Sequence, residues 1–279
     1  MQRSVTRKSI NDYKQYLFAA EKAKATVTKY INEAERLAEY LNGNPLNKRA
    51  LLEYRETLAE NFSSRTVNTK LAAINGYLAF IGADEYKVQL LKVQRRAFID
   101  ESRELSAAEY KRLVNAADVG GNDRLSLVMQ TICATGIRIS ELSYITVDAV
   151  KERRIEIRLK GKSRTVIIPS KLCKKLVEYA RRQRIDTGAV FRTKGGKPLD
   201  RANVCHDMKR LCDAAHVERS KVFPHNLRHL FARAFYSIEK NLSHLADVLG
   251  HSSIETTRIY VAASSRQYER MLDKMKLIT

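Results

Sequence analysis

Apolar residues recur at three- and four-residue steps through most of the chain, and this spacing constrains the fold more than any other feature. The clearest case runs from Thr26 to Asn42, where the pattern is typical of an amphipathic helix and is followed by the stop signals Gly43 and Pro45. The sequence therefore predicts a mainly α protein. Further helices are expected at 51–58, 64–82, 125–134, 170–184, 201–216, 224–237, 242–250, 253–263 and 265–277.

One segment has the alternation of a strand instead. Ile155, Ile157 and Leu159 alternate with charged residues, the letters KGKS follow, and a second apolar stretch at 165–168 runs up to Pro169. We expect a β-hairpin with lysines at its tip, and thus a small antiparallel sheet within a helical protein.

The chain divides into two parts. Residues 1–95 have the pattern of a small, all-helical domain, whereas 92–105 loses the helical period and crowds charges of both signs, as an exposed connector does. Ser106, with Glu109 three residues later, then predicts a capped helix start. We expect a helical domain at 1–95, a linker at 96–105 and a mixed α/β domain with a small antiparallel sheet at 106–279.

Charge points to the class of partner. The 279 residues include 51 Lys or Arg and 31 Asp or Glu, a formal net charge of +20 that is spread over both halves. Excess positive charge favours binding to a polyanion, nucleic acid first, although a merely basic protein remains an alternative. No apolar run approaches the roughly 18–20 residues that span a bilayer, and the N-terminus lacks a signal peptide's apolar core, so we expect no membrane partner and a cytoplasmic location.

Neither a metal nor another cofactor is expected. The cysteines show no Cys-x-x-Cys spacing, which favours reduced thiols over a disulfide framework or zinc site. The GGK at 195–197 lacks the upstream Gly and the Ser or Thr of an ATP-binding phosphate loop. Only Glu141 and Asp247 lie near the residues considered next, too few carboxylates for two-metal chemistry.

Five motifs of the second half carry candidate chemistry: ATGIRISEL, LKGKSR, PHNLRH, LGHSS and TTRIY. Each alone has an ordinary structural explanation, but their order and contexts together resemble the catalytic domain of the tyrosine recombinase (integrase) family over nearly all of this half. SSRTVNTKLAAINGYLAFIG in the first half is similar to that family's helical core-binding, SAM-like domain. The residues in question are Arg138, Lys160, His225, Arg228, His251 and Tyr260.

The resemblance implies a site that breaks a DNA phosphodiester. Tyr260 would be the nucleophile and form a covalent 3′-phosphotyrosyl intermediate. Guanidinium groups suit the charge that grows on the phosphate oxygens, the role expected for Arg138 and Arg228. His225 and His251 would add hydrogen bonds to the same oxygens, and His225 could accept the phenol proton.

The leaving 5′-oxygen needs a proton, and a lysine at the hairpin tip is a suitable general acid if burial lowers its pKa. The resemblance assigns this role to Lys160, with Lys162 as the alternative because the register of the turn is open. Glu141, one helical turn after Arg138, is expected to support the site by orienting that arginine or a histidine.

The expected partners are two double-stranded DNA sites and three further copies of the chain. The segment after Tyr260 has apolar residues on one helical face, which either packs on its own domain or docks on a neighbouring copy. In family members, exchange of such a tail links a homotetramer on DNA. An accessory DNA-bending or directionality factor is left open. No room is evident for a separate arm-site domain, so simple core sites are expected.

Integration or excision of a mobile element is the expected role, with chromosome-dimer resolution or DNA inversion by the same chemistry as alternatives. Two other classes compete: a helix-turn-helix regulator, suggested by LSHLADVLGHSSIETTRIY, and a type IB topoisomerase acting on one duplex.

Overall fold

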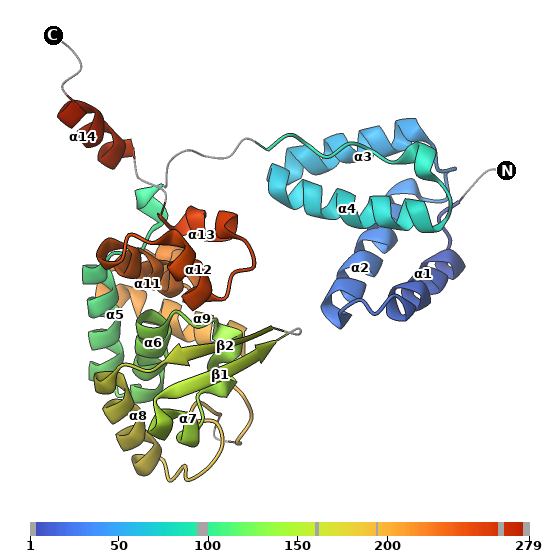
Figure 1. Cartoon of the computed structure of the whole chain (residues 1–279). Helices are drawn as coiled ribbons and strands as arrows, with labels where there is room; N and C mark the ends of the chain where they lie inside the picture. Colours follow the sequence, from blue (N-terminus) through green and yellow to red (C-terminus); the bar gives the residue numbers. More distant parts are fainter. Residues whose placement is uncertain (1–3, 94–99, 160–161, 194, 262–264, 276–279) are drawn as a thin grey trace. The chain divides into compact units, whose positions relative to one another are not determined.

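A computed structural model describes residues 4–93, 100–159, 162–193, 195–261 and 265–275, and the chain forms two compact units, residues 1–95 and 96–279 (Figure 1). Helices dominate both units, and the described strands form a single two-stranded antiparallel sheet. The prediction of a mainly α protein with a small antiparallel sheet is therefore confirmed. Within the described ranges, no helix is both long and apolar enough to span a bilayer.

Unit 1 is a helical domain whose first helix the sequence analysis did not predict. That helix, α1, opens with a capping box between Thr6 and Ser9 and buries Ile10, Tyr13 and Leu17, one apolar residue per turn. The unit also buries an ion pair, in which Lys70 Nζ lies 2.9 Å from a carboxylate oxygen of Glu33. Its elements are α1 (Arg7–Ala19), α2 (Lys24–Leu41), α3 (Lys48–Asn61), α4 (Ser64–Phe80) and the 3-10 helix η1 (Asp84–Tyr86).

Unit 2 packs its helices around a large apolar core and a single hairpin. The predicted helix at 201–216 is divided at Leu211 into two shorter helices. The elements are η2 (Glu101–Arg103), α5 (Ala107–Val119), α6 (Asp123–Thr135), η3 (Ile139–Tyr144), α7 (Val147–Glu152), β1 (Arg154–Leu159), β2 (Lys162–Ile167), α8 (Ser170–Arg182), α9 (Arg201–Arg210), α10 (Cys212–Ala215), η4 (Arg219–Lys221), α11 (Pro224–Ile238), α12 (Leu242–Leu249), α13 (Ile254–Val261) and α14 (Ser265–Met275).

The hairpin has one buried and one exposed face. Strand β2 begins three residues earlier than the apolar stretch at 165–168 suggested, and Ile155 pairs with Val166 while Ile157 pairs with Arg164. Ile155, Ile157 and Val166 are buried. Because side chains alternate along a strand, Arg164 occupies an inward position where an apolar residue would be expected.

Contacts of α11 and α12 bring distant parts of unit 2 together at the candidate site. Helix α11 packs on α6 and α13, and α12 packs on α13 and β2 (Figure 1). At the end of α6, Gly136 adopts a left-handed backbone with φ +65°, and a Cβ there would lie 2.4 Å from the Phe231 ring. Glycine thus permits the close approach of α6 and α11.

Residues 103–105, which we call the entry strap, lead into α5 and pack on unit 2. Leu105 is fully buried in the core of this unit. The end of the segment expected as a linker therefore takes part in the packing of the second unit.

Candidate active site

A buried carboxylate organises two arginines at the start of the site. Glu141 is 1% exposed and accepts three hydrogen bonds: from the backbone N–H of Arg138 at 2.7 Å, from Arg138 Nη1 at 2.9 Å and from Arg164 Nη2 at 2.6 Å. Bonds between a guanidinium and a carboxylate are among the strongest and most directional in proteins. Glu141 therefore fixes both guanidinium groups, although the Arg138 side chain stays 39% exposed and open to a ligand.

Arg164 is a member of this site that the sequence analysis missed. Its Nη1 donates to the carbonyl of Val248 at 3.0 Å, which ties β2 to α12, and its aliphatic part lies against Gly250. Burial lowers the pKa of Arg164 and the nearby Arg138 adds to that effect, while Glu141 opposes it. An arginine at an inward position of a short strand was the signal available in the sequence.

Arg228 lies deepest in the cluster. It projects from α11, is 1% exposed, and donates to the carbonyl oxygens of Gly136 and, at 2.7 Å, Leu249. Burial lowers its pKa to about 10, and the charges of Arg138 and Arg164 push in the same direction. Its Nε, although buried, has no hydrogen-bond partner among the described residues. A buried donor left open in this way is suited to an incoming acceptor.

His251 is held in one tautomer by two neighbours. Its Nε2 lies 3.0 Å from Arg228 Nη2 and its Nδ1 lies 2.8 Å from the hydroxyl of Thr257. Because a guanidinium only donates, Nε2 must accept, and the proton therefore resides on Nδ1. Burial lowers the pKa of His251 to about 4, and Arg228 and Arg138 reinforce the shift. The ring is neutral at pH 7.

Tyr260 is 5% exposed and lies among three imidazole rings. Its hydroxyl is 3.4 Å from His225 Nε2. The ring centroid of Tyr260 is 4.4 Å from that of His229, 5.4 Å from that of His251 and 5.8 Å from that of His225. Partial burial, then the neighbouring His229 and Arg228, hold the pKa of His225 well below its usual range. His225 is therefore a neutral imidazole whose Nε2 faces the phenol hydroxyl.

Five of the six residues singled out from the sequence thus come together: Arg138, His225, Arg228, His251 and Tyr260. Lys160 lies outside the described residues. Lys162 is described as the first residue of β2, opposite Leu159, but its side chain lies outside the described part.

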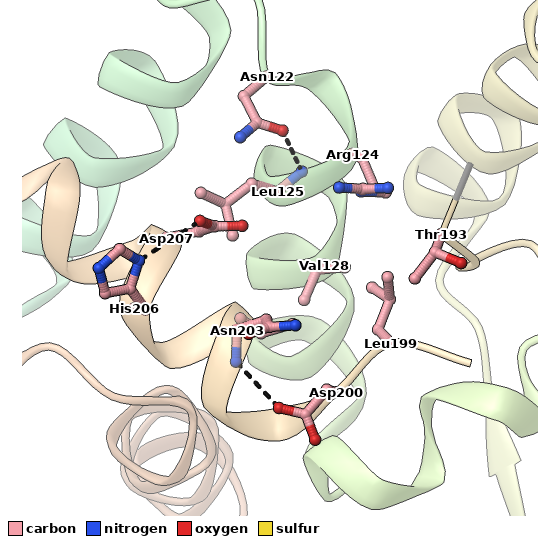
Figure 2. A pocket seen from close by; sticks show the side chains of 11 residues that line it. Asn122, Arg124, Leu125, Val128, Thr193, Leu199, Asp200, Asn203, His206 and Asp207 are labelled. Atoms are coloured by element: carbon pink, nitrogen blue, oxygen red, sulfur yellow. Dashed lines mark hydrogen bonds and ion pairs between the residues drawn. The ribbon is translucent and has the colours of Figure 1, made fainter. Parts of the chain in front are cut away.

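A separate pocket of about 220 Å³ contains none of these residues. It lies between α6 and α9 and is lined among others by Asn122, Asp200, Asn203 and His206 (Figure 2). Within the described ranges, no three His, Cys, Asp or Glu side chains gather in a way that could hold a metal ion, and this includes the neighbourhood of Cys205 and His206.

The charges of the cluster suit an anion. The guanidinium groups of Arg138 and Arg164 bond the carboxylate of Glu141, a third guanidinium, that of Arg228, lies against His251, and His225 and His251 are neutral. Three guanidinium groups and one carboxylate leave two positive charges unbalanced, and of these guanidinium groups that of Arg228 interacts with Tyr260. Such an arrangement favours a phosphate whose charge increases toward a dianion as a nucleophile attacks.

Comparison with known proteins identifies the family. The model of the phage integrase family matches residues 103–267, which include every residue of this cluster. The chain belongs to this family. It is a tyrosine recombinase, an enzyme that breaks and rejoins DNA strands, and the resemblance seen in the sequence is confirmed. A helix-turn-helix regulator is thereby excluded as the class of protein.

Individual relatives match nearly the whole chain. The tyrosine recombinase XerA of Thermococcus kodakarensis is 29% identical, and the alignment covers 96% of this chain and 95% of XerA. A post-cleavage complex of the XerH site-specific recombinase with a palindromic difH substrate has a TM-score of 0.74 at 20% identity, covering 91% of this chain and 81% of XerH. The lambda integrase tetramer bound to a Holliday junction has a TM-score of 0.73 at 16% identity, covering 93% and 78%. At these identities the solved structures show a shared fold.

Proposed function

We propose that the chain recombines specific DNA sites through a covalent 3′-phosphotyrosyl intermediate on Tyr260. The observation that carries this proposal is the buried Tyr260, which lies against His251 and interacts with Arg228 in the arginine cluster, with a neutral imidazole 3.4 Å from its hydroxyl. An unperturbed phenol has a pKa near 10, so only about one in a thousand is ionised at pH 7 and a base is needed. His225 supplies that base.

The cleavage step balances without any further reagent. The Tyr260 oxygen bonds to phosphorus as its proton passes to His225 Nε2, the P–O5′ bond breaks, and the 5′-oxygen takes a proton from Lys160. Arg138, Arg164 and Arg228 stabilise the charge on the non-bridging oxygens. The tyrosyl ester conserves the energy of the broken bond, and attack by the 5′-hydroxyl of another strand reverses the step.

The general acid is tested with a modified leaving group. We propose Lys160, with Lys162 as the alternative. A DNA strand with sulfur in place of the bridging 5′-oxygen leaves without protonation, so it restores cleavage to a variant that lacks only the acid. The modified strand should restore cleavage by Lys160→Ala, whereas Lys162→Ala should cleave the unmodified strand as well. Restoration of Lys162→Ala alone would transfer the role to Lys162.

The proposed partner is DNA held by both units, with four copies of the chain joining two sites. The lambda integrase tetramer on a Holliday junction supports this assembly by analogy. In this chain Leu272 and Met275 of α14 are 50% and 54% exposed, which leaves apolar surface for a neighbouring copy. A chain that ends at Ser265 should bind single sites but not assemble, as measured by light scattering on DNA; unchanged assembly contradicts tail exchange.

The biological role we propose is integration or excision of a mobile element. Chromosome-dimer resolution is the second candidate. XerA and XerH align with this chain over most of their length, and their Xer names point to that role. The identity of the DNA sites distinguishes them, since a mobile element has its sites at its ends and a chromosome resolution site does not accompany one.

Covalent trapping tests the proposal and recovers the sites together. The protein is incubated in EDTA with fragmented genomic DNA of the organism that encodes it, quenched with SDS, and compared with Tyr260→Phe. An adduct that survives denaturation and requires Tyr260 supports the proposal, and its sequence gives the site. Tight DNA binding without any adduct, also on a nicked site that loses its leaving strand, contradicts it.

A further inference from the structure

The ring of His229 lies nearest to the ring of Tyr260, yet His229 has no part in the cleavage step. Its ring centroid lies 4.4 Å from that of Tyr260 in an edge-on arrangement, closer than either His225 or His251. It also lies 4.7 Å from the His225 ring. A side chain that touches both the nucleophile and its base controls where they sit.

The other side of His229 is held by the entry strap. Its Nδ1 lies 3.4 Å from Glu104 Oε1, across 125 residues of sequence. Glu104 is 12% exposed and its second oxygen lies 3.6 Å from Arg233. Burial alone would raise the pKa of Glu104, but the hydrogen bond of His229 and the charges around it together lower the pKa. The carboxylate is thus ionised, accepts only, and places the His229 proton on Nδ1.

All three residues of the entry strap contact one face of α11. The carbonyl of Arg103 accepts from Asn226 at 2.9 Å, Glu104 accepts from His229, and the carbonyl of Leu105 accepts from Arg233 at 2.5 Å. Residues three and four apart share a helical face. His229 lies four residues after His225, so it borders both this face and the catalytic one.

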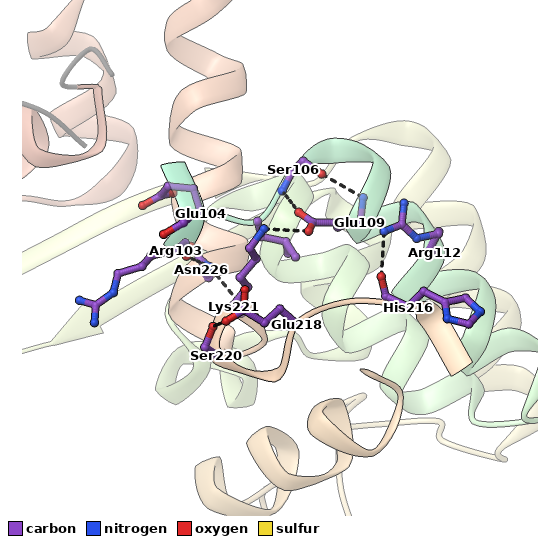
Figure 3. A network of polar contacts seen from close by, with 12 residues as sticks. Arg103, Glu104, Ser106, Glu109, Arg112, His216, Glu218, Ser220, Lys221 and Asn226 are labelled. Atoms are coloured by element: carbon purple, nitrogen blue, oxygen red, sulfur yellow. Dashed lines mark hydrogen bonds and ion pairs between the residues drawn. The ribbon is translucent and has the colours of Figure 1, made fainter. Parts of the chain in front are cut away.

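A second set of contacts fixes the strap's far end. Glu109 accepts from Lys221 at 3.0 Å and from the backbone of Ser106 at 2.8 Å, and the Asn226 amide also donates to the carbonyl of Lys221 (Figure 3). These contacts secure the start of α5 without touching His229. They provide a matched control for the Glu104 contact.

We propose that Glu104 and His229 form a positioning pair that holds the ring of Tyr260 toward His225 and so connects the entry strap to the nucleophile. This inference rests on the proposed role of Tyr260. The pair sets the rate of cleavage and not the affinity for DNA, because neither side chain belongs to the anion-binding cluster. The strap belongs to unit 2, and its contact with Tyr260 runs through the hydrogen bond between Glu104 and His229 and the ring contact between His229 and Tyr260.

Three substitutions separate the parts of the pair. Glu104→Leu removes the acceptor at nearly the same size, Glu104→Gln retains an acceptor oxygen for His229, and His229→Phe retains the ring but loses the donor. Each is assayed on a nicked duplex with the site sequence recovered by trapping. Adduct formation is followed in single turnover at saturating protein, and affinity is measured by filter binding.

Misplacement of a reacting group by about 1 Å costs on the order of 100-fold in rate, so we expect Glu104→Leu and His229→Phe to slow adduct formation by roughly 10- to 100-fold. Glu104→Gln should stay close to the wild type. The double variant Glu104→Leu/His229→Phe should be no slower than His229→Phe alone, because both act through one contact. DNA affinity should be unchanged in all of them.

Glu109→Leu is the control for a merely structural effect. It removes an equally enclosed carboxylate of the same region and should lower the melting temperature without slowing adduct formation. The proposal is overturned if Glu104→Gln and Glu104→Leu slow adduct formation equally, or if the effects of the two substitutions on this rate add in the double variant. It is also overturned if a fall in DNA affinity accounts for the slower adduct formation. A wild-type protein that forms no adduct at Tyr260 refutes the proposed function instead, before any variant is compared.

Discussion

Replacing Glu141 by Gln should release the Arg138 guanidinium from the acceptor that it shares with Arg164. The carboxylate accepts three hydrogen bonds with 1% of its side chain exposed. Glutamine keeps one acceptor oxygen, best used by the Arg138 backbone and Arg164, and turns its NH₂ group toward Arg138 Nη1, which can only donate. The Arg138 guanidinium is then pushed away from the site.

The size of the effect follows from the hydrogen bonds that glutamine cannot make. A hydrogen bond to a charged group contributes about 1.5–3 kcal/mol. The bond from Arg138 Nη1 disappears, and the bond from the Arg138 backbone N–H loses its charged acceptor. We therefore expect a decrease of about 2–4 kcal/mol in the free energy of unfolding. At roughly 2–4 °C per kcal/mol for a domain of this size, the melting temperature falls by about 10 °C. Misdirection of Arg138 should slow adduct formation by on the order of 10- to 100-fold.

Two measurements check the Glu141 prediction: urea unfolding, and single-turnover adduct formation at saturating DNA and at a temperature where the variant is folded. Glu33→Gln is the matched control, because Glu33 is an equally buried carboxylate that bonds Lys70 and Arg36 in unit 1. It should reduce stability and leave the rate of adduct formation unchanged. Wild-type rates for Glu141→Gln, or equal rate losses in both variants, would refute this reasoning.

Three further outcomes are expected. Gly136→Ala should lower the free energy of unfolding by about 1–3 kcal/mol more than Gly121→Ala in thermal denaturation, because both glycines have positive φ but only Gly136 would also overpack against an aromatic ring. The folded state holds the pKa values of His225 and His251 below the unfolded value of about 6.5, so the unfolded chain takes up protons first as pH falls. Their contribution to stability should be complete above about pH 6.5 and decline toward pH 4, as urea unfolding at several pH values would show. Arg164→Met should slow adduct formation on a nicked site although Arg138 and Arg228 remain, and a wild-type rate would exclude Arg164 from the site.

Local signals in the sequence were sufficient for most of the fold. The capping box of Ser106 and Glu109 and the helix expected at 125–134 depend on residues that are neighbours in the chain, and both are confirmed. Helix α1 was missed although Ile10, Tyr13 and Leu17 have helical spacing, because the segment is otherwise polar and offers only one apolar residue per turn. Its stability comes from packing on unit 1.

The site residues to which the motifs assign a role could be predicted from the sequence, and the others could not. Arg164 was not predicted because its place in the site depends on the register of the hairpin. The register turns its side chain inward, and none of the motifs specifies that register. The contact of Glu104 with His229 spans 125 residues and exists only after folding. Pairing of this kind is set by tertiary packing, which local patterns do not encode.

The most direct test of the central claim is mass spectrometry of the trapped adduct after digestion with trypsin and nuclease. Cleavage after Arg258 and Arg266 yields the peptide 259–266, in which Tyr260 is the only tyrosine. We expect a nucleotide attached through its 3′-phosphate to Tyr260 in this peptide. A nucleotide on any other residue, or one linked through its 5′-phosphate, would contradict it.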